Sequence, residues 1–240
     1  MFIPRGLSPE RGNKYYNRKA DGGYSPCRVG NPRQPGLSVL SNCVGYATGR
    51  FNEIIGSGAC LYLGSTNAEN FADLAKSQGL TVKSEPTFGG CMVWAKGKTW
   101  NGNDGAGHVA IVEGINPDGS IVTSESEFNH RPFVSRVRSG KNWGQNSTYR
   151  YIGCIVNPGA ANPYTRPDWT IKEGENSAGV KWAQYYLRAH GFDLGVWGVD
   201  GCFGNATLKA VKRFQARWNL LPDGVIGRIT KAALERGFAL

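Results

Sequence analysis

The chain has 240 residues, of which 40% are hydrophobic, and a formal net charge of +10. This length suits one large domain or two modest ones, and the hydrophobic content is sufficient for an ordinary buried core. No stretch approaches the ~20 apolar residues of a membrane-spanning helix, so membrane insertion is not expected. The charge favours polyanionic partners, but no zinc-finger spacing, arginine-rich recognition helix or aromatic platform indicates nucleic-acid binding.

The six cysteines are even in number, which allows disulfides, but they are widely separated. They are Cys27, Cys43, Cys60, Cys91, Cys154 and Cys202. No pair of them has the spacing of metal ligands, so neither a metal site nor a cofactor is expected. Most are expected to behave as small buried apolar side chains, with their disulfide status open.

The first half of the chain predicts helices followed by strands. Residues 1–38 have no clear period and are expected to form an arm over the domain that follows. Ser41 and Asn42 are capping candidates before a predicted helix that Gly56 ends. A second helix is predicted after Thr66, where Thr66 and Glu69 have capping-box spacing. Strands are predicted at residues 91–94, 108–113, 120–125 and 151–156, with a turn at 116–119. This order predicts an α+β domain with an antiparallel sheet over residues 1–157.

The second half predicts a linker and a small helical domain. Residues 158–169 are rich in Pro, Ala and Asn and are expected to form a semi-rigid linker. In residues 170–240, the pattern Asp200-Gly201 … Gly204 … Thr207 … Ala210 recurs as Asp223-Gly224 … Gly227 … Thr230 … Ala233. Each copy predicts a glycine turn leading into a helix, after an earlier helix over residues 180–189. The buried side chains are expected to be Leu208, Val211 and Phe214 in one copy, and Ile229, Ala232 and Ala233 in the other.

A cysteine hydrolase needs a thiolate, an imidazole and a group that orients the imidazole. Cys43 lies at the first turn of a predicted helix, where free N–H groups and the helix dipole stabilise a thiolate, although a buried structural cysteine is the default interpretation. His108 opens a strand after a glycine-rich stretch. Folding the hairpin around residues 116–119 brings His108 opposite Glu125 or Glu127, depending on the register. A surface cross-strand pair is the alternative interpretation.

Four blocks of sequence carry a resemblance to a known family. They are Asn42-Cys43-Val44-Gly45-Tyr46-Ala47, Gly90-Cys91-Met92-Val93-Trp94, Gly107-His108-Val109-Ala110-Ile111-Val112 and Ser124-Glu125-Ser126. Over residues 35–157 they resemble the CHAP domain, the cysteine- and histidine-dependent amidohydrolase/peptidase family with a papain-like α+β fold. The resemblance implies that Cys43 is the nucleophile, His108 the general base and Glu125 the orienting group. Asn42, Glu127 and Asn129 are candidate accessory residues. Asn42 or the Cys43 N–H is the candidate hydrogen-bond donor to the oxyanion that forms when the thiol attacks the amide.

The C-terminal residues carry a second resemblance. Val180, Trp182, Gln184, Leu187, Gly191, the two Asp-Gly repeats and Phe214-Gln215 resemble the peptidoglycan-binding domain of the first type. The match spans residues 172–237 and implies a three-helix wall-binding module without catalysis of its own. Trp197, Asp200, Trp218 and Asp223 are the candidate wall contacts, and for both tryptophans a place in the core is the alternative.

Together these features predict an amide-bond hydrolase of peptidoglycan, either an N-acetylmuramoyl-L-alanine amidase or an endopeptidase. Residues 4–12 resemble the lead-in of phage-type lysins of clostridial hosts. The expectation is therefore a monomeric phage endolysin that binds peptidoglycan with both domains. The N-terminus lacks the apolar core of a signal peptide, so the protein is expected in the host cytoplasm until a holin releases it to the wall. A bacterial autolysin, a virion-associated lysin and a non-catalytic wall-binding protein are the alternatives.

Overall fold

The computed structural model describes residues 2–10, 12–18, 23, 25, 38–56, 63, 66–96 and 107–237. These residues form two compact units: the first is Arg5–Ala160, and the second is Phe2–Pro4 together with residues 161–237. The division therefore assigns residues 158–160 of the predicted linker to the first unit and residues 161–169 to the second. Most of the predicted N-terminal arm, together with Cys27 and Cys60, lies outside the described residues.

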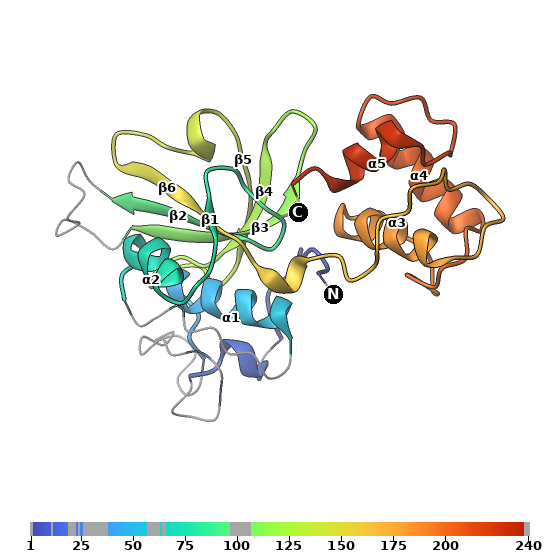
Figure 1. Cartoon of the computed structure of the whole chain (residues 1–240). Helices are drawn as coiled ribbons and strands as arrows, with labels where there is room; N and C mark the ends of the chain where they lie inside the picture. The colour runs from blue at the N-terminus through green and yellow to red at the C-terminus, as the bar shows by residue number, and fades with distance from the viewer. Residues whose placement is uncertain are drawn as a thin grey trace. The chain divides into compact units, whose positions relative to one another are not determined.

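A six-stranded antiparallel sheet forms the centre of the first unit (Figure 1). Its strands are β1 (Val82–Lys83), β2 (Cys91–Lys96), β3 (His108–Ile115), β4 (Ile121–Glu125), β5 (Val134–Arg138) and β6 (Tyr149–Ile155). They lie in the order β1-β6-β2-β3-β4-β5. Residues 91–95 and 109–112 are buried throughout, as expected of central strands. The α+β class and the antiparallel sheet are confirmed, and β1 and β5 are strands that the sequence did not indicate.

In the described part of the first unit two helices accompany this sheet, and the first of them contacts β3. They are α1 (Cys43–Ile55) and α2 (Phe71–Ser77), and the 3₁₀ turns are Lys14–Tyr16, Ala68–Asn70, Lys141–Trp143 and Pro158–Ala160. The Asn42 side chain accepts a hydrogen bond of 2.9 Å from the Gly45 N–H and so caps α1 as predicted, while Gly56 ends the helix with a φ of 92°. The fully buried Tyr46 and Phe51 anchor α1 to the core.

The predicted capping box of the second helix is wrong. A 3₁₀ turn comes first, so that α2 begins only at Phe71, and no side chain caps either start. Thr66 instead accepts a hydrogen bond of 3.0 Å from the Asn70 side chain. The apolar stripe that motivated the prediction does hold the helix in place, since Phe71 and Ala75 are fully buried.

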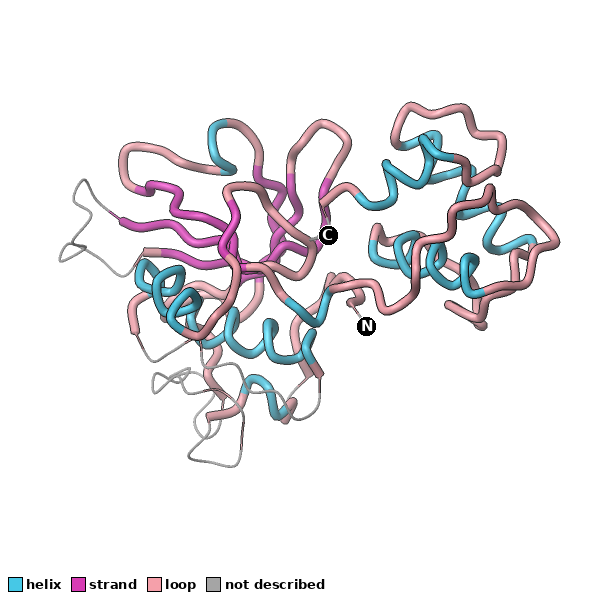
Figure 2. The backbone as a smooth tube through the Cα atoms, viewed as in Figure 1, coloured by secondary structure: helices cyan, strands magenta, loops and turns pink. Residues whose placement is uncertain are grey.

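The second unit contains three helices and no named strands among its described residues. Figure 2 accordingly draws it as helix and loop. They are α3 (Ala178–Ala189), α4 (Asn205–Arg217) and α5 (Arg228–Glu235). The predicted core face of α4 is largely confirmed, because Val211 and Phe214 are fully buried. The predicted face of α5 is wrong: Ile229 is 67% exposed, and the helix instead buries Thr230, Lys231 and Leu234.

The repeat seen in the sequence corresponds to a repeated hydrogen-bond pattern, which we call the glutamine bracket. In the first bracket the Gln184 amide donates to the Asp200 carboxylate, the Cys202 carbonyl and the Thr207 hydroxyl at 2.8–3.1 Å, and accepts from the Gly201 N–H. In the second, Gln215 makes the corresponding bonds to Asp223, Val225, Thr230 and Gly224 at 2.8–3.3 Å. Each buried amide is thereby satisfied, which removes the cost of placing it in a core.

A buried ammonium connects α5 to the chain that precedes the helices. Lys231 is 3% exposed, and its Nζ donates to the Pro167 carbonyl at 2.8 Å and to the Trp169 carbonyl. Burial is the first cause that lowers the pKa of Lys231. The end of the predicted linker is therefore a packed part of the second unit.

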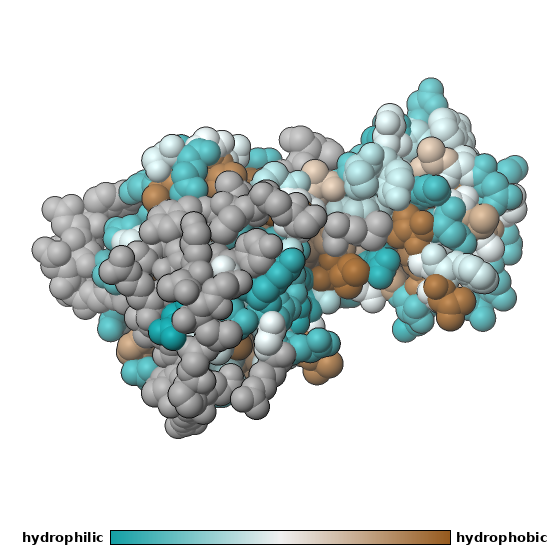
Figure 3. All heavy atoms as spheres, turned by 90° about the horizontal axis from the view of Figure 1, so that it is seen from below, coloured by the Kyte–Doolittle hydropathy of each residue, from teal (hydrophilic) through white to brown (hydrophobic). Residues whose placement is uncertain are grey.

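The surface is mostly hydrophilic where Figure 3 shows described residues, with hydrophobic side chains in separate patches. The most exposed large hydrophobic side chains of the second unit are Val196, Trp197, Leu221 and Ile229. No helix in the described part of the chain has the length and apolar character needed to cross a bilayer.

Candidate active site

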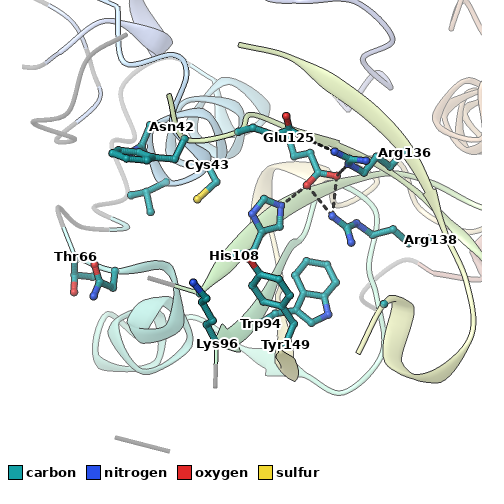
Figure 4. A pocket seen from close by; sticks show the side chains of 16 residues that line it. Asn42, Cys43, Thr66, Trp94, Lys96, His108, Glu125, Arg136, Arg138 and Tyr149 are labelled. Atoms are coloured by element: carbon teal, nitrogen blue, oxygen red, sulfur yellow. Dashed lines mark hydrogen bonds and ion pairs between the residues drawn. The ribbon is translucent and has the colours of Figure 1, made fainter. Parts of the chain in front are cut away.

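A groove of about 750 Å³ lies in the first unit and collects the residues that the sequence selected (Figure 4). Its described lining includes Asn42, Cys43, Thr66, Trp94, Lys96, His108, Glu125, Glu127, Arg136, Arg138 and Tyr149. These side chains come from α1, from β2 to β6 and from the adjoining loops. A groove lined by several strand ends and one helix start has the form of a substrate-binding cleft.

Cys43 is the first residue of α1 and is 9% exposed. Its position follows from the Asn42 cap, which sets the start of the helix one residue before the thiol. The N–H groups of a first helical turn have no partner within the helix, and they present a positive field to groups in front of it. The thiol therefore lies where a negative charge is stabilised, at the edge of the groove.

His108 is the first residue of β3 and pairs with Trp94 of β2. The residue before it, Gly107, has a φ of +65°, and a Cβ there would lie 2.5 Å from the Trp94 carbonyl oxygen. Only glycine fits such a left-handed position at so close an approach. The chain can therefore enter β3 with the imidazole turned toward the groove, where Figure 4 shows it between Cys43 and Glu125.

Glu125 is the last residue of β4, is 1% exposed and binds the His108 Nε2 through Oε2. The side-chain contact therefore identifies Glu125, and not Glu127, as the partner of the imidazole. Two arginines of β5 also hold Glu125: Arg138 Nη2 donates to its two oxygens at 2.8 and 2.7 Å, and Arg136 Nε lies 3.1 Å from Oε1. Such charge-assisted contacts fix the orientation of a buried carboxylate.

The ionisation of this cluster follows from its contacts. Burial lowers the pKa of His108, but hydrogen bonds to Cys43 and Glu125, with their charges, outweigh it and raise the pKa to about 9. Burial works to raise the pKa of Glu125, yet its bond to His108 and the nearby arginines bring it below the ordinary value. At neutral pH the imidazole therefore carries its proton and faces an ionised carboxylate.

The candidate accessory residues have partners of their own, although Glu127 shares Arg136 with Glu125. Glu127 lines the groove, but it binds Arg131 at 2.8 Å, Arg136 and the His130 ring, and the hydrogen bond to Arg131 is the first cause that lowers its pKa to about 2. Asn129 is exposed, is not among the described lining residues, and donates its backbone N–H to the Ser41 carbonyl. Asn42 lines the groove, but its side-chain oxygen already serves the helix cap.

The candidate wall contacts of the second unit divide into two kinds. Trp197 is 81% exposed, whereas Trp218 is 8% exposed and packs on Phe214 and His190, which agrees with the alternative of a core position for Trp218. Asp200 and Asp223 are exposed residues, but in each the Oδ1 oxygen accepts hydrogen bonds within its glutamine bracket. Of the four candidates, Trp197 therefore offers the largest free surface.

The other described cysteines differ from Cys43 in environment. Cys91 and Cys154 are fully buried, and burial is the first cause that raises the pKa of each thiol, to about 11 for Cys154. Cys202 is exposed, and all four described cysteines are free thiols. Within the described ranges, no group of three or more His, Cys, Asp or Glu side chains is arranged to hold a metal ion.

Several residues that shape the site carry no signal in the sequence pattern. Arg136 and Arg138 lie on a strand whose inward positions are partly buried and polar, while Val137 is 70% exposed. The usual alternation of apolar inward and polar outward residues is inverted there, so the pattern does not resemble a core strand. Lys96, at the end of β2, lines the groove as well.

Comparisons with known proteins agree with this arrangement. Residues 33–127 match the family model of the CHAP domain, and residues 176–234 match that of the peptidoglycan binding domain PG_binding_1. The chain is 34% identical over 142 residues to the staphylococcal secretory antigen SsaA of Staphylococcus aureus, covering 53% of this chain and 52% of the relative. It is 34% identical over 119 residues to the antigen ssaA2 of the same species, covering 45% and 40%. The chain thus spans about half the length, or less, of these curated relatives.

Among solved structures, an N-acetylmuramoyl-L-alanine amidase from Staphylococcus aureus is similar at 25% identity with a TM-score of 0.36, covering 48% of this chain and 31% of that one. A peptidoglycan-binding protein from Clostridioides difficile is similar at 22% identity with a TM-score of 0.27, covering 58% and 66%. The groove lies in the first unit, within which the first matched range falls, and the three helices lie in the second. The chain thus matches a CHAP domain over residues 33–127 and, after it, a peptidoglycan binding domain over residues 176–234.

Proposed function

We propose that this protein hydrolyses an amide bond in peptidoglycan, with Cys43 as nucleophile, His108 as proton carrier and Glu125 as the group that orients the imidazole. The observation that carries the proposal is the convergence of these three side chains on one groove, where His108 lies between Cys43 and Glu125 and is hydrogen-bonded to Glu125 (Figure 4). A thiol, an imidazole and a carboxylate in this order form the arrangement that activates a cysteine for acyl transfer.

The chemistry follows from the ionisation of the site. An imidazolium beside the thiol favours the thiolate, which attacks the amide carbonyl and forms a tetrahedral oxyanion. The Cys43 N–H, at the start of α1, is placed to stabilise that oxyanion. His108 gives its proton to the leaving amine as the carbon–nitrogen bond breaks, and the acyl group remains on sulfur as a thioester. His108 then takes a proton from the water that attacks the thioester carbonyl. The carbon–sulfur bond breaks, which releases the acyl group as a carboxylic acid and restores the thiolate beside the imidazolium.

The second unit would hold the enzyme on its insoluble substrate. Its match to a peptidoglycan binding domain and its exposed Trp197 support a wall contact on this unit. Tethering to the polymer raises the local concentration of cleavable bonds without adding any contact in the groove. The partners of the protein in this proposal are the stem peptide at the groove and the wall polymer at the second unit.

For the biological role, we favour a phage endolysin acting on Gram-positive walls of the clostridial type. The resemblance of residues 4–12 to clostridial phage lysins supports this role. The protein would act as a monomer that waits in the host cytoplasm and reaches the wall when a holin opens the membrane. The candidate second role is a bacterial autolysin, which the similarity to staphylococcal secretory antigens favours. A holin gene beside the coding sequence would support the role of endolysin. A position in a bacterial cell-wall operon, without a holin gene beside it, would support the role of autolysin.

The proposed activity is tested by clearing of Gram-positive walls. Wild-type protein should lower the turbidity of purified walls, and Cys43→Ala should lower the rate by at least about a thousandfold, since the nucleophile is lost. Cys202→Ala is the matched control, because this cysteine is exposed and lies in the second unit. Equal clearing by wild type and Cys43→Ala would show that the nucleophile is assigned wrongly.

Mass spectrometry of the digested walls identifies the bond. Muramic acid residues that have lost their peptide would indicate an amidase, and new amino termini within the stem or bridge would indicate an endopeptidase. If walls treated with wild-type protein contain neither product, the proposed function as a whole is contradicted.

A further inference from the structure

The charges that line the groove are paired, with one exception among the described residues. Arg138 and Arg136 contact Glu125, and Arg136 also contacts Glu127. Lys96 also lines the groove, and no described residue forms an ion pair or hydrogen bond with its side chain. The positive charge of its ammonium is therefore not neutralised by the part of the groove that the structure describes.

The strand register places Lys96 close to the reacting groups. Trp94 pairs with His108 on β3, and Lys96 pairs with Tyr149 on β6. Side chains two residues apart on a strand point to the same face, so Lys96 shares a face with Trp94 and, across the pair, with His108. The His108 and Tyr149 rings lie 6.4 Å apart, which brings the two pairs together. Figure 4 shows Lys96 extending toward the space that Cys43 and His108 face.

We propose that Lys96 is a specificity residue that binds a carboxylate of the substrate near the bond that is cut. The inference rests on the proposed hydrolase function and narrows its substrate to a peptide with an acidic group beside the reactive amide. A partly buried ammonium at the wall of a cleft gains most from a charged acceptor, because the cleft shields the pair from solvent. Stem peptides supply such carboxylates, and each can also occur as a neutral carboxamide.

The experiment compares two versions of one substrate. A muropeptide fragment that contains the cleaved bond, identified from digested walls, is prepared with each carboxylate in turn free or converted to the carboxamide. The full chain is assayed as wild type, Lys96→Met and Lys96→Arg. Wild type should prefer one free carboxylate by about tenfold or more in kcat/KM, because a charge-assisted hydrogen bond is lost in the carboxamide.

The variants decide whether Lys96 is responsible. Lys96→Met should cleave the free acid and the carboxamide at nearly equal rates, and Lys96→Arg should retain most of the preference. Lys76→Met is the matched control: this lysine lies on α2, 58% of its side chain is exposed, and its removal should leave the preference unchanged. If Lys96→Met slows both substrates by the same factor, Lys96 acts on the thiol or on folding, and the inference is wrong.

Failure of the inference is distinguishable from failure of the proposed function. A protein that clears walls through Cys43 but shows no preference between acid and carboxamide contradicts only the role of Lys96. A protein that clears no walls contradicts the hydrolase itself.

Discussion

The His108 imidazole lies between the Cys43 thiol and the Glu125 carboxylate, and these two groups raise its pKa. Hydrogen bonds to the Cys43 thiol and the Glu125 carboxylate outweigh the effect of burial, and the pKa rises from 6.5 to about 9. The imidazolium contributes stability that is complete below pH 6.5 and is lost as the pH rises through about 9, because the folded state holds the proton more tightly than the unfolded chain. The reactive form of the site is therefore expected across the neutral range.

This ionisation predicts the pH profile. For wild type, kcat/KM should fall on the alkaline side with an apparent pKa near 9, as His108 loses the proton that the leaving amine needs. Glu125→Gln should move this alkaline limb to lower pH, since a hydrogen bond and a negative charge that raise the pKa of His108 are weakened or removed.

Glu127→Gln is the control for that profile, because Glu127 lines the same groove but bonds to Arg131, Arg136 and His130. Its alkaline limb should coincide with that of wild type. An unchanged limb in Glu125→Gln, measured on a soluble fragment over pH 6–10, would contradict the assignment of Glu125 as the partner of the imidazole.

At this scale the sequence indicated Cys43, His108 and a carboxylate, because each follows a local signal: a helix cap, a strand start and a hairpin end. It left Glu125 and Glu127 open, since alternation places both on one face. Only their side-chain contacts separate them, because Glu125 binds His108 and Glu127 binds Arg131. It did not indicate Arg136 and Arg138. Arginine on the inward side of an edge strand has no sequence signature, and its partner becomes known only when β5 is placed beside β4.

Among the elements, α1 and β3 carry the nucleophile and the imidazole at their first residues, and a buried ion pair joins them. Arg50 of α1 donates through Nε and Nη2 to Glu113 of β3 at 2.8 and 3.0 Å. Glu113 also accepts hydrogen bonds from the Ser124 hydroxyl at 2.7 Å and from the Arg5 N–H at 2.8 Å. Both oxygens of the Glu113 carboxylate therefore accept hydrogen bonds. The ion pair with Arg50 fixes the distance between α1 and β3.

Removing one partner of this pair should be costly. Arg50 and Glu113 are 5% and 3% exposed, and an unpaired buried charge destabilises a protein by about 3–5 kcal/mol. We therefore expect Arg50→Met to lower the free energy of unfolding by that amount, measured with urea. Replacing both partners, as in Arg50→Met with Glu113→Leu, should recover part of the loss.

The exposed pair of Lys76 and Asp73 provides the control for this measurement, because 58% and 67% of their side chains are exposed. Lys76→Met should change the free energy of unfolding by less than about 1 kcal/mol. A similarly small effect of Arg50→Met would show that the Arg50–Glu113 pair does not hold α1 to β3.

Prediction of the elements succeeded where periodicity was strong and failed where it was short or shifted. The four predicted strands and α1 are present, because their apolar residues face one core. The two-residue strand β1 is too short for any period to appear. In α5 the apolar Ile229 and Ala232 suggested a buried face, but the second glutamine bracket holds Thr230 inward and the carbonyls of Pro167 and Trp169 draw Lys231 inward, which rotates the helix.

For the whole molecule, the two units separate the proposed chemistry from the proposed attachment. Wall binding should therefore survive loss of the nucleophile, and full-length Cys43→Ala should sediment with purified walls. Within this background, Trp197→Ala should reduce the bound fraction without lowering the thermal midpoint, because the indole is 81% exposed and its loss opens no cavity.

Trp218→Ala is the contrasting variant in the same assay. Trp218 is 8% exposed, and truncation of a buried tryptophan costs about 3–5 kcal/mol, so the expected effect is on unfolding first. Full retention of Trp197→Ala on walls, over a range of salt concentrations, would place the wall contact elsewhere on the second unit.

The helix α4 takes part in both glutamine brackets, since it supplies Thr207 to the first and Gln215 to the second. A cut before α4 would thus deprive the buried Gln184 amide of its acceptor Thr207, and a cut after α4 would deprive the buried Gln215 amide of its acceptor Thr230. Lys231 of α5 also donates hydrogen bonds to the carbonyls of Pro167 and Trp169, which precede the first helix of the unit. The smallest segment that could be grafted onto another enzyme is accordingly the whole second unit, residues 161–237 with Phe2–Pro4, and a single repeat would not suffice.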